Sequence, residues 1–123
     1  MFKVIWLVRF RRDVPREDVL AWWRGPHAAL AAATPGMVRY VQSHWLAPLD
    51  LATSQPVDGA SPAFDGHAEH WFESREAYDA AMASEEWALT RADGSSHFDS
   101  STLAGVALEE TVVLWEADGA DGR

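Results

Sequence analysis

Apolar residues dominate the first ten positions and fall on both faces of any extended segment they could form. Residues 2–10 are rich in aromatic and β-branched side chains, which favours a β-strand. A strand that is apolar on both faces is typical of the interior of a sheet. Further strands are predicted over residues 37–46, 66–73 and 108–116, the last centred on the β-branched run at 111–115.

The segments between these strands carry helical spacing and helix-start signals. Asp13, as a cap, and Pro15, in the first turn, predict a helix that Gly25-Pro26 should break or kink. Pro26 can begin a second helical segment that ends near residue 33. Ser74 is a favourable cap for a later helical region, which continues with a break to about Ala92.

The resulting order, β-α-β-β-α-β, is the ferredoxin-like split βαβ pattern. It predicts an α+β fold in which a four-stranded antiparallel sheet carries its helices on one face. Because the strands are apolar on both faces, we expect a second copy of the chain to cover the other face, which makes a homodimer. We assign residues 1–117 to one domain and 118–123, rich in Gly and Asp, to a flexible tail. The long polar segment 48–65 is expected to form a lid over the ligand.

Composition and charge exclude several classes of partner. The chain has 123 residues with a formal net charge of −9, which opposes binding to nucleic acid and to anionic membranes. Cysteine is absent, so thiolate nucleophiles and cysteine-type metal sites are excluded. The apolar run at the start is too short to span a bilayer and lacks a signal-peptide cleavage site, so a cytoplasmic location is expected.

Several short motifs occur in an order and spacing that together resemble the EthD family. They are Trp22-Trp23-Arg24 with His27-Ala28, Pro35-Gly36, residues 39–44, residues 65–74, residues 83–86, and His97-Phe98-Asp99. The resemblance implies a dimeric α+β barrel, a fold shared with antibiotic-biosynthesis monooxygenases, muconolactone-type isomerases and small polyketide cyclases. It also implies a ligand held between the helices and the sheet. His67 and His70 depart from the family pattern, which typically carries apolar residues there.

Three residues are the candidate catalytic groups. His27 matches the family's helix histidine, and it is predicted in a first helical turn, where the helix dipole would lower its pKa and keep a neutral base. The alternative is a histidine that only bridges the kink by hydrogen bonds. His44 and Tyr40 fall on one face of a strand and could act as base and oxyanion donor. For Tyr40, a purely structural core role is also open.

A second group of residues is expected to contact the ligand. The chain has 7 tryptophans spread over all the predicted elements, so a cavity between sheet and helices should be lined by indoles and favour a flat, apolar or phenolic molecule. The candidate substrate-binding residues are Trp6, Trp23, Glu69, Trp71 and His97. Glu69 could instead pair with an arginine such as Arg39 in a subunit interface.

Neither a metal nor an organic cofactor is expected. His67 and His70 are three apart on a strand and therefore point to opposite faces, so they cannot easily share one ion. A site assembled from His27, His44 and His97 remains an open alternative. The sequence contains no Gly-rich phosphate loop, nucleophile elbow or dinucleotide fingerprint.

These observations favour an enzyme that works by acid–base chemistry on a small aromatic or polyketide-like molecule. Lyase, isomerase and cyclase reactions all fit, since each moves a proton beside a stabilised enolate. One alternative is a cofactor-free monooxygenase of the same fold. Another is a non-catalytic module that shields a hydrophobic metabolite.

Overall fold

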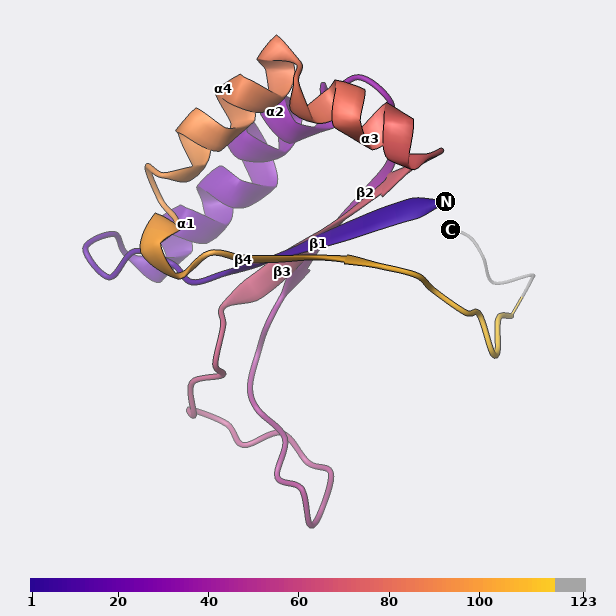
Figure 1. Cartoon of the computed structure of the whole chain (residues 1–123). Helices are drawn as coiled ribbons and strands as arrows, with labels where there is room; N and C mark the ends of the chain where they lie inside the picture. Colours follow the sequence, from indigo (N-terminus) through magenta and orange to yellow (C-terminus); the bar gives the residue numbers. More distant parts are fainter. Residues whose placement is uncertain (117–123) are drawn as a thin grey trace.

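The computed structural model describes residues 1–116 of the chain. Its elements are, in order, β1 (Phe2–Val8), α1 (Arg16–Trp22), the π-helical η1 (Trp23–His27), α2 (Ala28–Ala32), β2 (Met37–His44), β3 (Gly66–Phe72), α3 (Arg75–Met82), α4 (Glu85–Gly94), the short 3-10 helix η2 (Ser100–Thr102) and β4 (Ala104–Leu108). Figure 1 shows the helices together on one side of a curved sheet. This arrangement confirms the predicted ferredoxin-like α+β fold.

The sheet has the strand order β2-β3-β1-β4, and all its neighbouring strands are antiparallel. The apolar β1 occupies an interior position, as its pattern predicts. Alternate residues of a strand face opposite sides, so Val4 and Val8 of β1 point toward the helices with Ala68 and Phe72 of β3. These buried side chains form the floor of the helix-covered layer.

The first helical region runs without a break from α1 through η1 into α2, although Pro26 lies inside it. Proline has no N–H and its ring clashes with the carbonyl four residues earlier, so a regular α-helical turn cannot contain it unchanged. The wider π-helical turn accommodates it. Of the predicted break or kink at Gly25-Pro26, the structure shows a π-helical irregularity and no break. His27 therefore lies inside a continuous helical rod rather than at a helix start.

Capping differs between the helical regions. Ser74 Oγ accepts from the Ala77 backbone N–H, and Ser84 Oγ accepts from that of Trp87, each at 3.1 Å. The first helix has no side-chain cap, because Asp13 pairs with Arg11 at 2.6 Å instead. The prediction of Asp13 as a cap is wrong.

The fourth strand is displaced from its predicted position. β4 pairs with β1 over Ala104–Leu108, while residues 109–116 form no strand, and Val113 is 91% exposed. Gly105 packs against the indole of Trp6 so closely that an added Cβ would lie 2.5 Å from Trp6 Cζ3. Close packing against Trp6 therefore outweighs the higher β-propensity of residues 111–115. The predicted tail, 118–123, lies outside the described residues.

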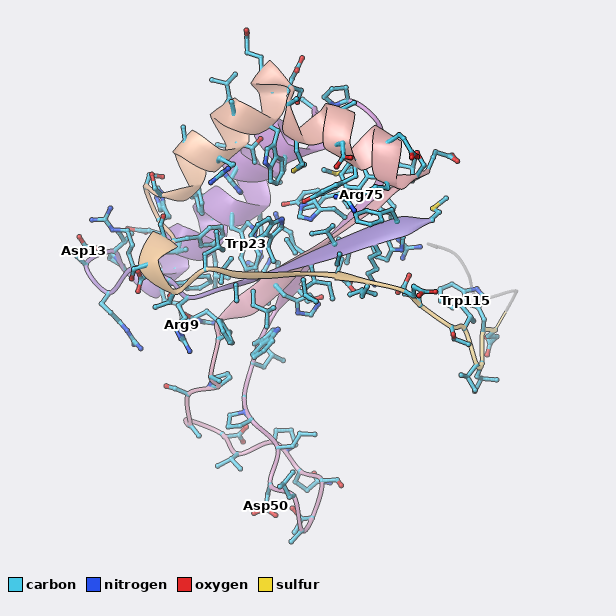
Figure 2. The ribbon with its side chains drawn as sticks, in the orientation of Figure 1. Arg9, Asp13, Trp23, Asp50, Arg75 and Trp115 are labelled. Atoms are coloured by element: carbon cyan, nitrogen blue, oxygen red, sulfur yellow. The ribbon has the colours of Figure 1, made fainter. Side chains whose placement is uncertain are left out.

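Residues 45–65 form a long connection without helix or strand, close to the predicted 48–65. Asp50 closes a turn by accepting from the backbone of Ala52 and Thr53. Figure 1 shows the loop extending away from the helices, and Figure 2 places Asp50 far from Trp23. The structure therefore does not support a lid over the layer between helices and sheet.

The face of the sheet opposite the helices, here called the open face, combines apolar and charged side chains. Lys3 is buried there, ion-paired with Glu69 at 2.8 Å and with Glu110, and 4.2 Å from the ring centre of Trp71. Arg39 also lies over the Trp71 ring, 4.8 Å from its centroid. Glu69 forms its ion pair with Lys3, so the predicted pairing with Arg39 is not the one observed. Within the described residues, every helix is too short or too polar to cross a membrane.

Candidate functional site

A cavity of about 220 Å³ lies between the helix layer and the sheet. Its walls include the indoles of Trp6, Trp23 and Trp87 and the ring of Phe98. The predicted indole-lined cavity is therefore present. A volume below the ~300 Å³ typical of drug-sized ligand sites indicates a small ligand.

The polar side chains on the cavity wall include His27, Tyr40 and His70, which come from η1, β2 and β3. They are far apart in sequence and meet because the rod packs across the sheet. The structure thus brings two of the predicted catalytic residues, His27 and Tyr40, into one cavity with the predicted ligand-contacting Trp6 and Trp23.

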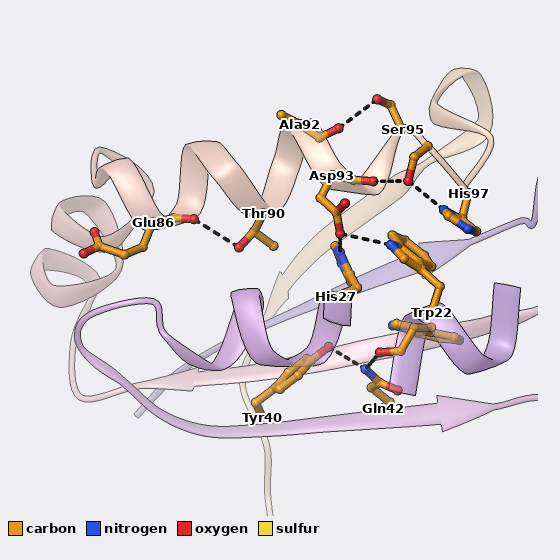
Figure 3. A network of polar contacts seen from close by, with 12 residues as sticks. Trp22, His27, Tyr40, Gln42, Glu86, Thr90, Ala92, Asp93, Ser95 and His97 are labelled. Atoms are coloured by element: carbon orange, nitrogen blue, oxygen red, sulfur yellow. Dashed lines mark hydrogen bonds and ion pairs between the residues drawn. The ribbon is translucent and has the colours of Figure 1, made fainter. Parts of the chain in front are cut away.

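His27 is only 6% exposed and is held by one carboxylate. Its Nδ1 lies 3.0 Å from Oδ2 of Asp93, in the last turn of α4, and the indole N–H of Trp22 donates to the same oxygen at 3.0 Å (Figure 3). A carboxylate only accepts, so Nδ1 carries the imidazole proton. Nε2 is then a bare acceptor, and it has no hydrogen-bond partner among residues 1–116.

Burial is the main cause that lowers the pKa of His27, and Asp93 opposes this effect in part. A nearby His97 lowers it further. The predicted cause was the dipole at a helix start, which the continuous rod rules out. Either way the imidazole is neutral near pH 7, so Nε2 can accept a proton.

Tyr40 is oriented by its neighbour Gln42. The Gln42 amide donates to the Tyr40 hydroxyl at 2.8 Å and to the Trp23 carbonyl at 2.7 Å (Figure 3). The tyrosine oxygen therefore acts as an acceptor, which leaves its own O–H free to donate. Burial raises the pKa of Tyr40 and keeps this proton in place.

His44 does not line the cavity. Its Nε2 lies 2.9 Å from Oε1 of Gln42, and its ring meets Trp23 edge-on at 4.8 Å. Burial, with Arg24 and Arg16, lowers the pKa of His44. The geometry makes it a positioning residue for Gln42, and through Gln42 for Tyr40, rather than a group that touches the ligand.

The other predicted ligand contacts lie elsewhere. Glu69 and Trp71 are on the open face, because residues of β3 alternate and Ala68 and His70 take the helix side. His97 stacks on Trp22 at 4.2 Å and its Nδ1 lies 2.6 Å from Ser96 Oγ. Glu69, Trp71 and His97 therefore do not line this cavity.

Two residues of the site are not among the sequence-predicted site residues. Asp93 follows the predicted end of a helix, and nothing in the local pattern links it to a histidine 66 positions away. His70 departs from the family pattern in the third strand, but the sequence gives it no place in a ligand site. Both acquire their significance from packing between distant segments.

A shared metal site is not supported by the geometry. Trp22 lies against both His27 and His97, and His44 lies beyond Trp23. No cluster of three or more potential ligands occurs among residues 1–116.

Comparisons with known proteins agree with the fold. The chain resembles an EthD family protein from Bacillus halodurans, with a TM-score of 0.72 and 19% identity over 90% of this chain and 99% of that one. A dimeric ferredoxin-like protein from Thermobifida fusca matches over 87% and 88% of the two chains, with a TM-score of 0.61 and 16% identity. An antibiotic biosynthesis monooxygenase matches over 90% and 99%, with a TM-score of 0.57 and 17% identity. No curated protein shows significant similarity.

The sequence comparison decides the family. Residues 11–101, which include the cavity residues His27, Tyr40 and His70 and the His27 partner Asp93, match the EthD domain. This confirms the resemblance drawn from the short motifs. Because the matched domain spans most of the chain, the protein belongs to the EthD family.

Proposed function

We propose that the cavity is the active site of an acid–base enzyme that moves a proton on a small aromatic or polyketide-like molecule. The observation that carries the proposal is His27 on the cavity wall, whose Nδ1 is held by Asp93 while Nε2 has no hydrogen-bond partner among residues 1–116. A neutral imidazole with one nitrogen fixed by a carboxylate is a common general base.

The reaction would begin at a carbon next to a carbonyl group. Nε2 of His27 takes the C–H proton, and Asp93 stabilises the imidazolium that forms. The electron pair of the broken C–H bond moves into the carbonyl, and the enolate oxygen receives a hydrogen bond from the free O–H of Tyr40. Return of the proton to another carbon, loss of a leaving group, or attack on a second carbonyl would give isomerase, lyase or cyclase outcomes.

The walls support an aromatic ligand. Trp6, Trp23, Trp87 and Phe98 offer ring faces and edges to a flat molecule, and the small volume limits its size.

The test measures proton exchange on aryl ketones that the cavity could hold. Acetophenone and its hydroxyl derivatives are incubated with the protein in heavy water, and loss of the signal of the protons next to the carbonyl is followed by NMR. We expect exchange above the buffer rate, and a fall of about 10² to 10⁴ in His27→Asn. Asparagine can still donate to Asp93 from the position of Nδ1, but it has nothing at the position of Nε2, so the fold should be kept.

His67→Asn is the matched control, because His67 is a histidine on the open face of β3. It should exchange at the wild-type rate. If the wild type binds these ketones and exchanges no faster than buffer, acid–base catalysis is wrong, and a binding module is favoured. Oxygen uptake with electron-rich phenols, independent of His27, would favour the cofactor-free monooxygenase instead.

A further inference from the structure

Arg91 of α4 lines the cavity and takes no part in the proposed reaction. Among the described residues on the cavity wall there is no aspartate or glutamate, although the chain has 19 acidic against 10 basic residues. The wall histidines, His27 and His70, are neutral near pH 7 because burial lowers the pKa of both. An arginine always carries its charge. Arg91 is therefore the charged group that a molecule in the cavity would meet directly.

The guanidinium belongs to the mouth of the cavity. Arg91, Ser95 and Ser100 line the cavity and are nevertheless exposed to solvent, so they mark the place where it opens. The inner wall is closed to water, since Trp23 is 1% and His27 is 6% exposed. The two ends thus differ chemically, with an aromatic inner end that holds the proposed base and a polar mouth that holds a cation.

No protein group neutralises Arg91 within residues 1–116, where it forms no hydrogen bond, ion pair or ring contact. The positions three and four residues before and after it, where a helical ion pair would form, hold no acid. Arg75 of α3, by contrast, pairs with Asp79 four residues later at 3.1 Å. The nearby Asp93 carboxylate is engaged by His27. The last turn of a helix favours a cation, but that effect leaves the N–H donors of Arg91 available.

Arg91 is also close to the proposed base. Gly94 follows it by three residues on the same face of α4, and side-chain positions with this spacing are about 5–6 Å apart. An added Cβ at Gly94 would lie 3.9 Å from Cε1 of His27. A single small molecule could therefore reach from the imidazole to the guanidinium.

We infer that Arg91 binds a carboxylate of the aromatic molecule, so that the ligand of this cavity is an aryl acid with its ring among the indoles and its acid group at the mouth. A guanidinium can donate two parallel N–H bonds to a carboxylate, which fixes its orientation. At the exposed mouth the acid keeps contact with water, so the cost of burying a charge is largely avoided. The inference rests on the proposed function only in using the same cavity, and it does not require His27 to act as a base.

The test compares ligands that differ in the charge of one substituent. The meta and para acetylbenzoates and the corresponding acetylbenzamides have nearly the same shape, but only the benzoates are negatively charged near pH 7. Dissociation constants are measured by isothermal titration calorimetry. The wild type should bind at least one of the acids about tenfold more tightly than its amide, as expected for one hydrogen-bonded ion pair. This preference should fall as salt is added, because the mouth is exposed.

Three variants assign the preference to a residue. Arg91→Gln removes the charge and should weaken binding of the acid to the level of the amide, with binding of the amide little changed. Arg91→Lys keeps the charge without the two-pronged geometry and should retain part of the preference. Arg12→Gln is the matched control, because Arg12 is likewise exposed and without a partner in the described chain, but does not line this cavity. It should retain all of the preference.

Equal binding of acid and amide by the wild type, or no binding of either acid, would overturn the inference. A preference that survives in Arg91→Gln would overturn it too, since the serines or the backbone would then hold the acid. An equal loss in Arg12→Gln would assign the preference to the net charge of the chain rather than to Arg91.

These binding results are independent of proton exchange on the uncharged acetophenones. Exchange that depends on His27, without a preference for the acid, would contradict only the inference about Arg91. A preference that depends on Arg91, without exchange, would contradict only the proposed function.

Discussion

Acid should destabilise the protein through His70, and His70→Leu should remove much of that effect. The pKa of His70 in the folded protein is about 4, against 6.5 for an ordinary histidine, because burial disfavours the charged ring. Between these values the unfolded chain binds a proton that the folded chain does not, so stability falls as pH falls from about 6.5 to about 4. At about 1.4 kcal/mol per pKa unit, the loss between pH 7 and pH 4 is about 3 kcal/mol.

The assay is urea unfolding of wild type and His70→Leu at pH values from 7 to 4. The difference in unfolding free energy between the two proteins should shift by about 3 kcal/mol in favour of leucine over this range. His27, whose pKa is also lowered by burial, is present in both proteins and largely cancels in the difference.

Thr34→Val is the control for this experiment. It also removes a buried polar group, but threonine does not titrate, so its stability difference from wild type should be the same at every pH. A His70→Leu difference that is equally constant from pH 7 to pH 4 would refute the reasoning, since His70 would then be protonated as easily in the folded chain as in the unfolded one.

The remaining predictions concern the base, the packing of β4 and the open face. Asp93→Asn should move the acid limb of the proton-exchange profile to lower pH, because Asp93 raises the pKa of His27; an unmoved limb would contradict the pairing. Gly105→Ala should lower the unfolding free energy by about 1–3 kcal/mol through its clash with an indole. Gly25→Ala should not lower the unfolding free energy, because an added Cβ there meets nothing within 4 Å. Equal losses of unfolding free energy in the two variants would argue against the clash at Gly105. The wild type should be a dimer by light scattering, with an interface of about 1,600 Å² or more, and Val106→Asp on the open face should yield a folded monomer. A wild type that is monomeric at micromolar concentration would exclude this interface.

A local sequence pattern is sufficient to predict a helix or strand where the adjacent residues of the segment all favour the same secondary structure. The two-faced apolar run of β1, the alternation of β3 and the serine caps of α3 and α4 each specify their element from adjacent residues. The order of these elements then restricts the topology to the split βαβ pattern. Residues 111–115 show the limit of this reasoning, because β-propensity is decided by packing, and Ala104–Leu108 packs against Trp6 instead.

The sequence by itself singled out His27, His44 and Tyr40, of which His27 and Tyr40 lie on the cavity wall, and it predicted that indoles would line the cavity. It could not determine the partners that make them useful. Asp93 reaches His27 only because α4 packs against the rod, and Gln42 frees the Tyr40 proton only through side-chain geometry. That Arg91 has no partner within residues 1–116 is likewise a property of the fold, since a polar group is paired or unpaired only with respect to the side chains and backbone that the fold places around it.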